Sequence, residues 1–260
     1  MNVADYYIYG KPEFGAWRDM HMRIEGSAVE DYEEIFSAMW QKTTGEPVPE
    51  DSLFLQDMQE DTLGYSGLKP DTCAGAGEKM VGVVDRVPRI RPEIMRRSYQ
   101  YAIDNARYRV QIVNPYLTLV RSVRKALYRA LERGVRVEIM VSTKSDVKIV
   151  PDVVAYNVHK LMKRGAEIYY YEEGFHHTKV MMVDDSFCTV GSANLNSRSL
   201  TFDYEVNAFI MDTCTTRQLQ NIFEKDKEQS TRLTPENWKQ RRNAWQRFKG
   251  WFFQILVPLI

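Results

Sequence analysis

Residues 175–205 read FHHTKVMMVDDSFCTVGSANLNSRSLTFDYE, and this stretch decides how the rest of the chain is interpreted. It contains the motif H x K x4 D x6 G S x N, formed by His177, Lys179, Asp184, Gly191, Ser192 and Asn194. Six residue types at fixed offsets occur by chance in a chain of this length only about a few times in a million. We therefore take this stretch as the chemical centre of the protein.

Two apolar runs make up most of the stretch. KVMMVD ends in a carboxylate, and FCTVGSAN ends in small and amide residues. Both runs are typical of buried strands that end where a loop begins. Because side chains alternate along a strand, we expect His177 and Lys179 to lie on the same side.

The residue types indicate chemistry on a phosphate ester. Imidazole is both a usable nucleophile and a leaving group near neutral pH, which makes His177 the candidate nucleophile. Lys179 supplies a positive charge, and the Ser192 hydroxyl and Asn194 amide supply donors that could hold non-bridging phosphate oxygens.

A metal site is the main rival interpretation for a histidine close to acids. The ammonium of Lys179 would compete with a cation, and HHTK lacks the helical i, i+4 histidine pair of the zinc proteases. A phosphodiester carries a single negative charge, which Lys179 and amide donors could meet by themselves. We therefore expect neither a metal nor any other cofactor.

The motif resembles the HKD signature of the phospholipase D superfamily. GFHHTKVMMVDD, VGSANLNSRSL and FDYEVN look most like the second HKD region of bacterial cardiolipin synthases. The resemblance implies a phosphohistidine formed on His177, with Lys179, Ser192 and Asn194 binding the phosphoryl oxygens. It also implies that Glu205 holds the imidazole, and that Asp184 is a supporting residue of the catalytic set.

The remaining sequence predicts an α/β fold. From residue 80 onward, apolar strand patterns alternate with helical patterns, as in a parallel α/β sheet. The resemblance narrows this to a phospholipase D-like mixed, largely parallel sheet flanked by helices. Asn114 and Tyr116 follow a predicted strand, so they are candidates for the pocket rim, although ordinary turn residues would look the same.

The opening of the chain can be laid on the segment that follows the motif. Asn2 then falls on Asn194, Asp19 on Glu205 and His21 on Asn207, within a segment expected to form a strand over residues 14–24. Asp19 and His21 are therefore further candidates for the pocket rim. We expect a partial first repeat at residues 1–43, a connector at 44–79, one complete HKD domain at 80–231 and a terminal helix at 232–260.

The absence of a first His, Lys and Asp set allows two interpretations. The chain is either an incomplete form of a two-HKD enzyme or a one-HKD protein that pairs with a second copy. We favour the incomplete form, because Asp19 and His21 still look arranged around a site whose nucleophile is missing.

Composition and the C-terminal tail bear on where the protein acts. The formal net charge is zero, which does not favour nucleic acid as a partner. The last helix is expected to run on from Thr234 into the tail GWFFQILVPLI, which is too short to span a bilayer. The tail suits a headgroup interface, although packing on its own domain or on the missing half is an equal alternative. We expect peripheral attachment at the cytoplasmic side of the bacterial cell membrane.

The sequence thus predicts a phosphatidyltransferase that forms cardiolipin from two phosphatidylglycerols and releases glycerol. The alternatives are a one-HKD homodimeric phospholipase or nuclease-type phosphodiesterase, and a catalytically inert half. The acceptor, the oligomeric state, and which of two histidines would be nucleophile and which acid in a complete enzyme stay open at this level.

Overall fold

The computed structural model describes residues 4–49, 79–90 and 93–256. The chain forms two compact units, Arg23–Lys79 and a larger one made of Met1–Met22 with Met80–Ile260. In the smaller unit, helix α2 (Ala28–Thr44) ends at Gly45, whose φ of 82° is the left-handed conformation that glycine adopts readily. Most of the expected connector, residues 44–79, lies outside the described residues, and the division of the chain into repeats stays a prediction.

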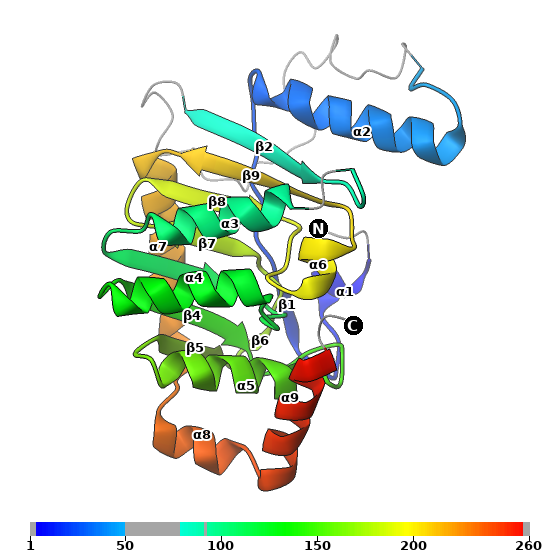
Figure 1. Cartoon of the computed structure of the whole chain (residues 1–260). Coiled ribbons are helices and arrows are strands. Elements are labelled where there is room, and N and C mark those ends of the chain that lie inside the picture. The colour runs from blue at the N-terminus through cyan, green and yellow to red at the C-terminus, as the bar shows by residue number, and fades with distance from the viewer. Residues whose placement is uncertain (1–3, 50–78, 91–92, 257–260) are drawn as a thin grey trace. The chain divides into compact units, whose positions relative to one another are not determined.

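The larger unit is built on an eight-stranded sheet with the strand order β10-β5-β4-β3-β7-β8-β9-β2 (Figure 1). Its strands are β2 (Met80–Arg86), β3 (Arg109–Val113), β4 (Arg136–Ser142), β5 (Glu167–Tyr171), β7 (Val180–Val183), β8 (Phe187–Gly191), β9 (Glu205–Met211) and β10 (Ser230–Arg232). The expected mixed sheet flanked by helices is confirmed.

Parallel pairing is less extensive than expected. Within the described part of the sheet, only β3 with β4 and β4 with β5 pair in parallel, and every other neighbouring pair is antiparallel. A parallel connection needs a crossover, usually a helix, and helices follow β3 and β4. The link from β7 to β8 is only residues 184–186, which is long enough for a hairpin and too short for a crossover.

Helices cover both faces of this sheet. They are α3 (Ile94–Asp104), α4 (Arg121–Glu132), α5 (Val150–Met162) and α7 (Thr213–Glu228). Figure 1 shows α3, α4 and α5 on one face and α7 on the other. The core between the layers is aliphatic, and Ile112, Leu127 and Ile139 are completely buried. This packing fixes the strand ends from which the loops of the motif extend.

A second, two-stranded sheet pairs β1 (Ala16–Arg18) in parallel with β6 (Gly174–His176). The strand expected over residues 14–24 is therefore limited to three residues, because only these meet a partner strand. A Cβ atom at Gly174 would overlap the backbone carbonyl of Ala16, so the close approach of the two strands depends on glycine. An N-terminal segment is thereby held against the motif.

The C-terminal segment forms two helices instead of the single helix expected, α8 (Pro235–Arg241) and α9 (Ala244–Leu256). The break has a local cause at Asn243. The Asn243 side chain accepts from the backbone N–H of Gln246 at 2.9 Å, and its own N–H donates to the Gln246 side chain at 3.1 Å. This reciprocal cap starts a new helix. No helix in the described part of the chain has the length and apolar character needed to cross a bilayer.

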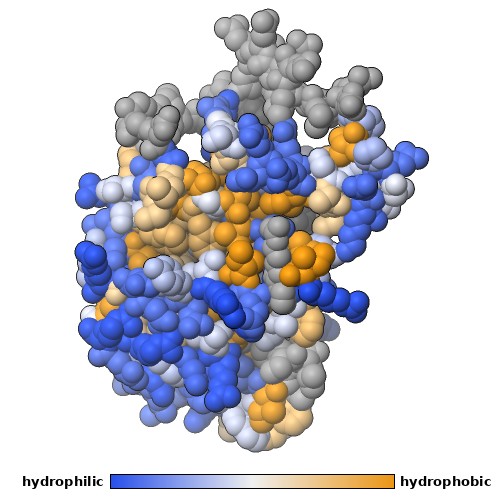
Figure 2. Space-filling model, turned by 45° about the horizontal axis from the view of Figure 1, so that its top comes forward, coloured by the Kyte–Doolittle hydropathy of each residue, from blue (hydrophilic) through white to orange (hydrophobic). Residues whose placement is uncertain are grey.

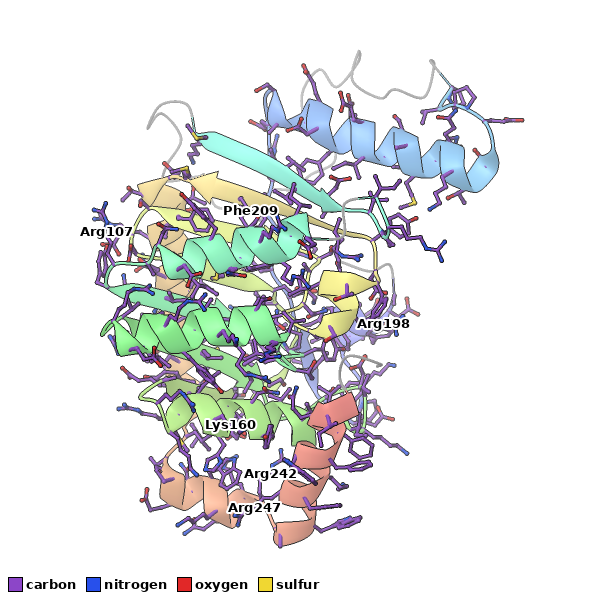
Figure 3. All side chains as sticks on the ribbon, viewed as in Figure 1. Arg107, Lys160, Arg198, Phe209, Arg242 and Arg247 are labelled. Atoms are coloured by element: carbon purple, nitrogen blue, oxygen red, sulfur yellow. The ribbon has the colours of Figure 1, made fainter. Side chains whose placement is uncertain are left out.

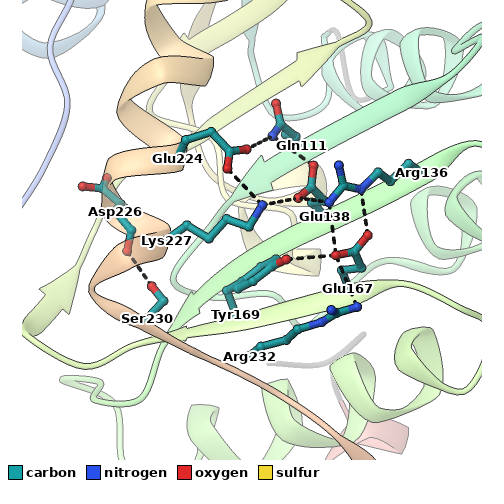
Figure 4. A network of polar contacts seen from close by, with 10 residues as sticks. All are labelled: Gln111, Arg136, Glu138, Glu167, Tyr169, Glu224, Asp226, Lys227, Ser230 and Arg232. Carbon is teal, nitrogen blue, oxygen red and sulfur yellow. Dashed lines mark hydrogen bonds and ion pairs between the residues drawn. The ribbon is translucent and has the colours of Figure 1, made fainter.

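A buried polar network ties α7 to the sheet (Figure 4). Gln111, Glu138 and Glu167 lie opposite one another across β3, β4 and β5. The Glu138 carboxylate is completely buried and pairs with Lys227 of α7 at 2.7 Å and with Arg136 at 3.1 Å. A charge this deeply buried is tolerated only when it is paired and hydrogen-bonded.

Replacing Lys227 with methionine is therefore expected to destabilise the fold by roughly 3 kcal/mol, because Glu138 loses its closest cation while staying buried. Urea unfolding followed by circular dichroism measures the change. Lys225→Met, which alters an exposed lysine of the same helix, is the matched control and should leave the unfolding midpoint almost unchanged. Adding Glu138→Gln to Lys227→Met should recover part of the loss, and a double variant weaker than the single one would contradict this account.

Candidate active site

The register between β1 and β6 brings Asp19 and His177 together. Arg18 lies opposite His176, and the backbone N–H of His177 donates to the carbonyl of Arg18 at 2.7 Å. Asp19 follows directly after β1, and His177 follows directly after β6. His177 Nδ1 lies 3.0 Å from Asp19 Oδ2. A proton held on Nδ1 by the carboxylate leaves the lone pair on Nε2, which is the nitrogen available for attack.

Asp226 of α7 locks the two short strands in this register. Its carboxylate accepts from Arg18 Nε at 2.9 Å, pairs with Arg18 Nη2 at 2.8 Å, and lies 3.1 Å from His176 Nε2. A two-point contact between guanidinium and carboxylate fixes orientation as well as distance. The pair therefore positions Asp19, the residue next to Arg18, and His176 supports this contact from a completely buried position.

Lys179 lies directly against the imidazole. Its Nζ is 3.0 Å from His177 Nε2 and 2.5 Å from the carbonyl oxygen of His177. The side chain is buried, with only 8% of the residue exposed. An ammonium beside the nucleophilic nitrogen is placed to neutralise an oxyanion that binds there.

Burial affects the pKa values of His177, Lys179 and Asp19. It lowers the pKa of His177, against the hydrogen bond to Asp19, which raises it. Burial also lowers the pKa of Lys179 to about 8, while the carboxylates of Asp19 and Glu205 act in the opposite direction. For Asp19, burial would raise the pKa, but the hydrogen bond to His177 and the charge of Lys179 bring it below its ordinary value. At neutral pH the site therefore holds a neutral imidazole between a carboxylate and an ammonium.

Four aromatic rings surround the imidazole. Their centroids lie at 5.0 Å for Trp17, 5.5 Å for Phe175, 5.7 Å for Tyr7 and 6.1 Å for Tyr116. Tyr116 is the candidate predicted at the pocket rim, and it lies beside the imidazole. The other three were not among the candidate site residues, although YYIYG and FGAWRD show aromatic residues near Asp19 in the sequence. The cage limits water around the imidazole.

The G S x N part of the motif forms a tight loop after β8. A Cβ atom at Gly191 would overlap the Asn207 side chain and the carbonyl of Val206, which explains glycine at this place. The Asn207 side chain is completely buried and accepts from the backbone N–H of Ala193 at 3.1 Å. Within the described residues, Asn194 Oδ1 is buried without a hydrogen-bond partner. Such an atom is unusual, and its lone pairs can accept a hydrogen bond from a ligand. A phosphate oxygen would be held instead by the Nδ2–H2 group of the same carboxamide.

Glu205 does not hold the imidazole of His177, contrary to the role that the family resemblance implied. Asp19 occupies that place, and Glu205 instead accepts a short hydrogen bond from the Ser192 hydroxyl. Burial raises the pKa of Glu205, against this hydrogen bond. Among the described residues, no hydrogen bond joins Glu205 to a histidine.

Three further candidates lie away from the imidazole. Asp184, with a φ of 51°, ends β7 at its far end and accepts backbone N–H groups from Arg107, Tyr108 and Arg109 at 3.0–3.3 Å. It fixes the start of β3, which is a supporting role and not a catalytic one. Asn114 is buried under the G S x N loop and accepts from the N–H of Leu195 at 3.4 Å, so it does not form a rim. His21 is exposed beyond β1.

Within the residues that the structure describes, no three His, Cys, Asp or Glu side chains are grouped so that they could hold a metal ion.

Sequence comparison relates the chain to phospholipid-synthesising enzymes. Residues 99–227 match the family described as cardiolipin synthase, PLD-like domain. The whole chain is 33% identical over 260 residues to cardiolipin synthase 2 of Staphylococcus epidermidis, and 31% identical over 259 residues to the major cardiolipin synthase ClsA of Bacillus subtilis. It spans 50% and 51% of these proteins, respectively, so it corresponds to about half of their length.

Solved structures share the fold at low sequence identity. Nuc of Salmonella typhimurium, a phospholipase D family member, aligns with a TM-score of 0.52 and 19% identity, over 60% of this chain and 99% of Nuc. Phosphatidylserine synthase of Haemophilus influenzae aligns with a TM-score of 0.53 and 16% identity, over 69% of this chain and 45% of that one.

The contact between Asp19 and His177 predicts a specific titration change. In Asp19→Asn the hydrogen bond and charge that raise the pKa of His177 are lost, so this pKa should fall further below its ordinary value. NMR titration of the histidine Cε1–H resonances, with His177→Ala to assign the signal, measures it. Asp5→Asn, in the same N-terminal segment but exposed, is the control. An unchanged His177 titration in Asp19→Asn would show that the carboxylate is not seated on Nδ1.

Lys179 should reduce stability at neutral pH, because its folded pKa of about 8 lies below its ordinary value of 10.5. Below pH 8 both the folded and the unfolded states carry the proton, and the folded state bears the cost of the buried charge. Lys179→Met should therefore be more stable than the natural chain at pH 7, by roughly 1–3 kcal/mol.

This difference should shrink as pH rises from about 8 to 10.5, because only the unfolded state then keeps the proton of Lys179. Urea unfolding at a series of pH values measures it, with the exposed Lys125→Met on α4 as control. A Lys179→Met variant less stable than the natural chain at pH 7 would contradict the prediction.

Proposed function

Residues 99–227 belong to the PLD-like domain family of cardiolipin synthases, and from this membership we propose that the chain supplies one half of a phosphatidyltransferase site that makes cardiolipin. The observation that carries the proposal is the spatial arrangement of Asp19, His177 and Lys179. The carboxylate is 3.0 Å from Nδ1 and the ammonium is 3.0 Å from Nε2 of the same ring. This arrangement suits a nucleophilic imidazole attacking a phosphodiester.

In the proposed reaction, His177 Nε2 attacks the phosphorus of phosphatidylglycerol. The P–N bond forms as the P–O bond to glycerol breaks, and the leaving glycerol takes a proton from a general acid. A hydroxyl of a second phosphatidylglycerol then returns a proton to that group and attacks phosphorus, which breaks the P–N bond and gives cardiolipin. Lys179 and the Asn194 carboxamide offset charge on the non-bridging oxygens, and Asp19 stabilises the imidazole throughout.

The general acid is proposed to be a second imidazole that sits on Glu205. In the alignment of the two repeats Glu205 corresponds to Asp19, the residue that holds His177. Burial raises the pKa of Glu205, and an imidazole donor would offset that effect. His177 of a second copy does not fit this role, because its Nδ1 is already occupied by Asp19. This favours a different half that carries its own HKD histidine over a homodimer of this chain.

A phospholipid substrate also implies work at a membrane surface. We propose peripheral attachment to the cytoplasmic side of the cell membrane, with anionic phosphatidylglycerol as substrate. The aromatic cage around His177 supports a water-poor pocket, in which a lipid hydroxyl competes with water as acceptor.

The proposal predicts that the chain alone forms little cardiolipin from labelled phosphatidylglycerol and that a companion polypeptide with a first HKD half restores synthesis. Acid-quenched samples should carry lipid-derived phosphorus on the protein. His177→Ala should remove this adduct and lower cardiolipin formation by at least about 10³-fold, because the nucleophile is lost.

His159→Ala is the matched control, since His159 lies on α5 away from the motif, and it should keep both adduct and product. Single-stranded DNA is offered in parallel as a phosphodiester of another class. Robust turnover by the chain alone would refute the half-site, and cleavage of DNA without lipid turnover would favour the nuclease-type alternative.

A further inference from the structure

Helix α9 carries an exposed apolar stripe along its whole length. The stripe is formed by residues at offsets i, i+3, i+7 and i+10, with exposed fractions of 65% for Trp245, 47% for Phe248, 43% for Phe252 and 58% for Ile255. Trp251, 47% exposed, lies beside it. Phe248 contacts Trp245, Trp251 and Phe252 at ring-centroid distances of 5.5–6.1 Å, so the aromatic side chains form one continuous surface.

The opposite face of α9 is committed to its own domain. Gly250 is buried where α9 crosses α5, and a Cβ atom there would overlap the carbonyl of Asp152. Lys249 pairs with Asp152 at 2.8 Å, and Gln254 accepts a short hydrogen bond from Asn157. The helix is therefore held in place, and its aromatic stripe is presented to the surroundings of the domain. Packing on its own domain, one of the alternatives considered for the tail, describes this face of α9, and the exposed face is left for an outside partner.

Positive charge is concentrated around this stripe. Residues 232–256 contain six basic residues and one acidic residue, although the chain as a whole has equal numbers of each. Four of the six, Arg232, Arg241, Arg242 and Lys249, pair with carboxylates of neighbouring elements. Lys239 and Arg247 have no ion pair among the described residues and are the cations of this segment that a partner could meet directly. Figure 3 labels Arg242 and Arg247 where α8 and α9 meet, and Lys160 on the neighbouring α5. Burial and then the charges of Lys163, Arg247 and Lys239 lower the pKa of His159 to about 4, as expected beside a cluster of cations.

We propose that the α9 stripe is a docking surface for an anionic phospholipid bilayer, with the aromatic and aliphatic side chains in the headgroup region and the surrounding cations over the lipid phosphates. An apolar face flanked by Lys and Arg is the pattern of helices that lie in the plane of a membrane interface. Helix α9 has 13 residues and is about 20 Å long, less than the ~30 Å of a hydrocarbon core, so it lies on the bilayer without crossing it.

A bilayer fits this surface better than a nucleic acid does. Phe248, Phe252 and Ile255 contribute no hydrogen-bonding groups. The aromatic rings could stack on bases, but Ile255 at the end of the stripe offers no face for stacking, whereas a headgroup region accommodates both kinds of side chain. Figure 2 shows hydrophobic residues reaching the surface at the lower right, where α9 lies, while hydrophilic residues cover the lower left. In Figure 1, α9 passes one end of α5 and rises toward the side of the sheet where α6 (Ser197–Thr201) and β1 lie. Docking through α9 would bring this side of the domain, which holds the proposed site, to its substrate.

The biological role of the docking surface rests on the proposed lipid function, but vesicle binding itself can be measured without turnover. The complete chain carrying His177→Ala is sedimented with vesicles of phosphatidylcholine alone or with phosphatidylglycerol added. We expect binding to the phosphatidylglycerol vesicles that weakens with salt, because the attraction is partly electrostatic. Replacing Trp245, Phe248 and Phe252 with glutamine should weaken it at least about tenfold, since each loses apolar area that the interface would bury.

Matched controls separate the stripe from general hydrophobicity and charge. An aromatic control replaces three exposed rings elsewhere with glutamine, namely Phe36, Trp40 and Tyr101. Two double variants test the charge. One combines Lys239→Gln and Arg247→Gln on α8 and α9, and its control combines Arg121→Gln and Lys125→Gln on α4, all at exposed positions. We expect only the α8–α9 changes to reduce binding, and circular dichroism confirms folding of each variant.

Three results would overturn the proposal. One is a stripe variant that binds phosphatidylglycerol vesicles as tightly as its parent does. Another is displacement of the chain from vesicles by single-stranded DNA that depends on the same residues. A parent that is dimeric by light scattering and a stripe variant that is monomeric would instead make the stripe an interface between copies. Vesicle binding that persists while a companion half fails to restore cardiolipin synthesis to the natural chain would count against the proposed transferase and leave the docking surface standing.

Discussion

The hydrogen bond between Asp19 and His177 is the contact on which the proposed site depends. It joins two residues that are 158 positions apart in the sequence, and it exists because β1 and β6 pair in a fixed register. A shift of one residue in that register would point Asp19 to the other side of its strand. Arg18 and Asp226 hold the register, so an N-terminal segment becomes part of the proposed site.

The same region shows how the proposed site would reduce stability. Lys179 is buried with a lowered pKa, and Glu205 is partly buried with a raised one. The Oδ1 atom of Asn194 lacks a hydrogen-bond partner among the described residues. In the eight-stranded sheet, by contrast, the buried Glu138 is paired with two cations, Arg136 and Lys227. Buried charge is balanced where it supports the fold and left incompletely balanced where a phosphate is proposed to bind.

Local patterns in the sequence predicted much of the fold, because each strand and helix of the sheet has its own periodicity and end signals. The motif also predicted that His177 and Lys179 lie together. The partner of His177 was assigned wrongly, since the family pattern favoured Glu205 and no local signal reports that β1 pairs with β6. Asp184 and Asn114 show the same limit: both stand at conspicuous places in the sequence, and their contacts are to backbone groups that only the three-dimensional fold brings near. The break at Asn243 was missed although N x x Q is a recognisable cap.

The tie between β1 and β6 also constrains how such proteins can be recombined. The sequence predicts that the first repeat continues to about residue 43, so that position looks like a natural junction between modules. A crossover there would give the proposed nucleophile to one descendant and the carboxylate that holds it to the other, because Asp19 lies on the far side of the junction. Recombination that preserves the proposed site must instead keep residues 4–22 together with the strands from residue 80 onward. The unit that is exchanged then differs from the predicted repeat.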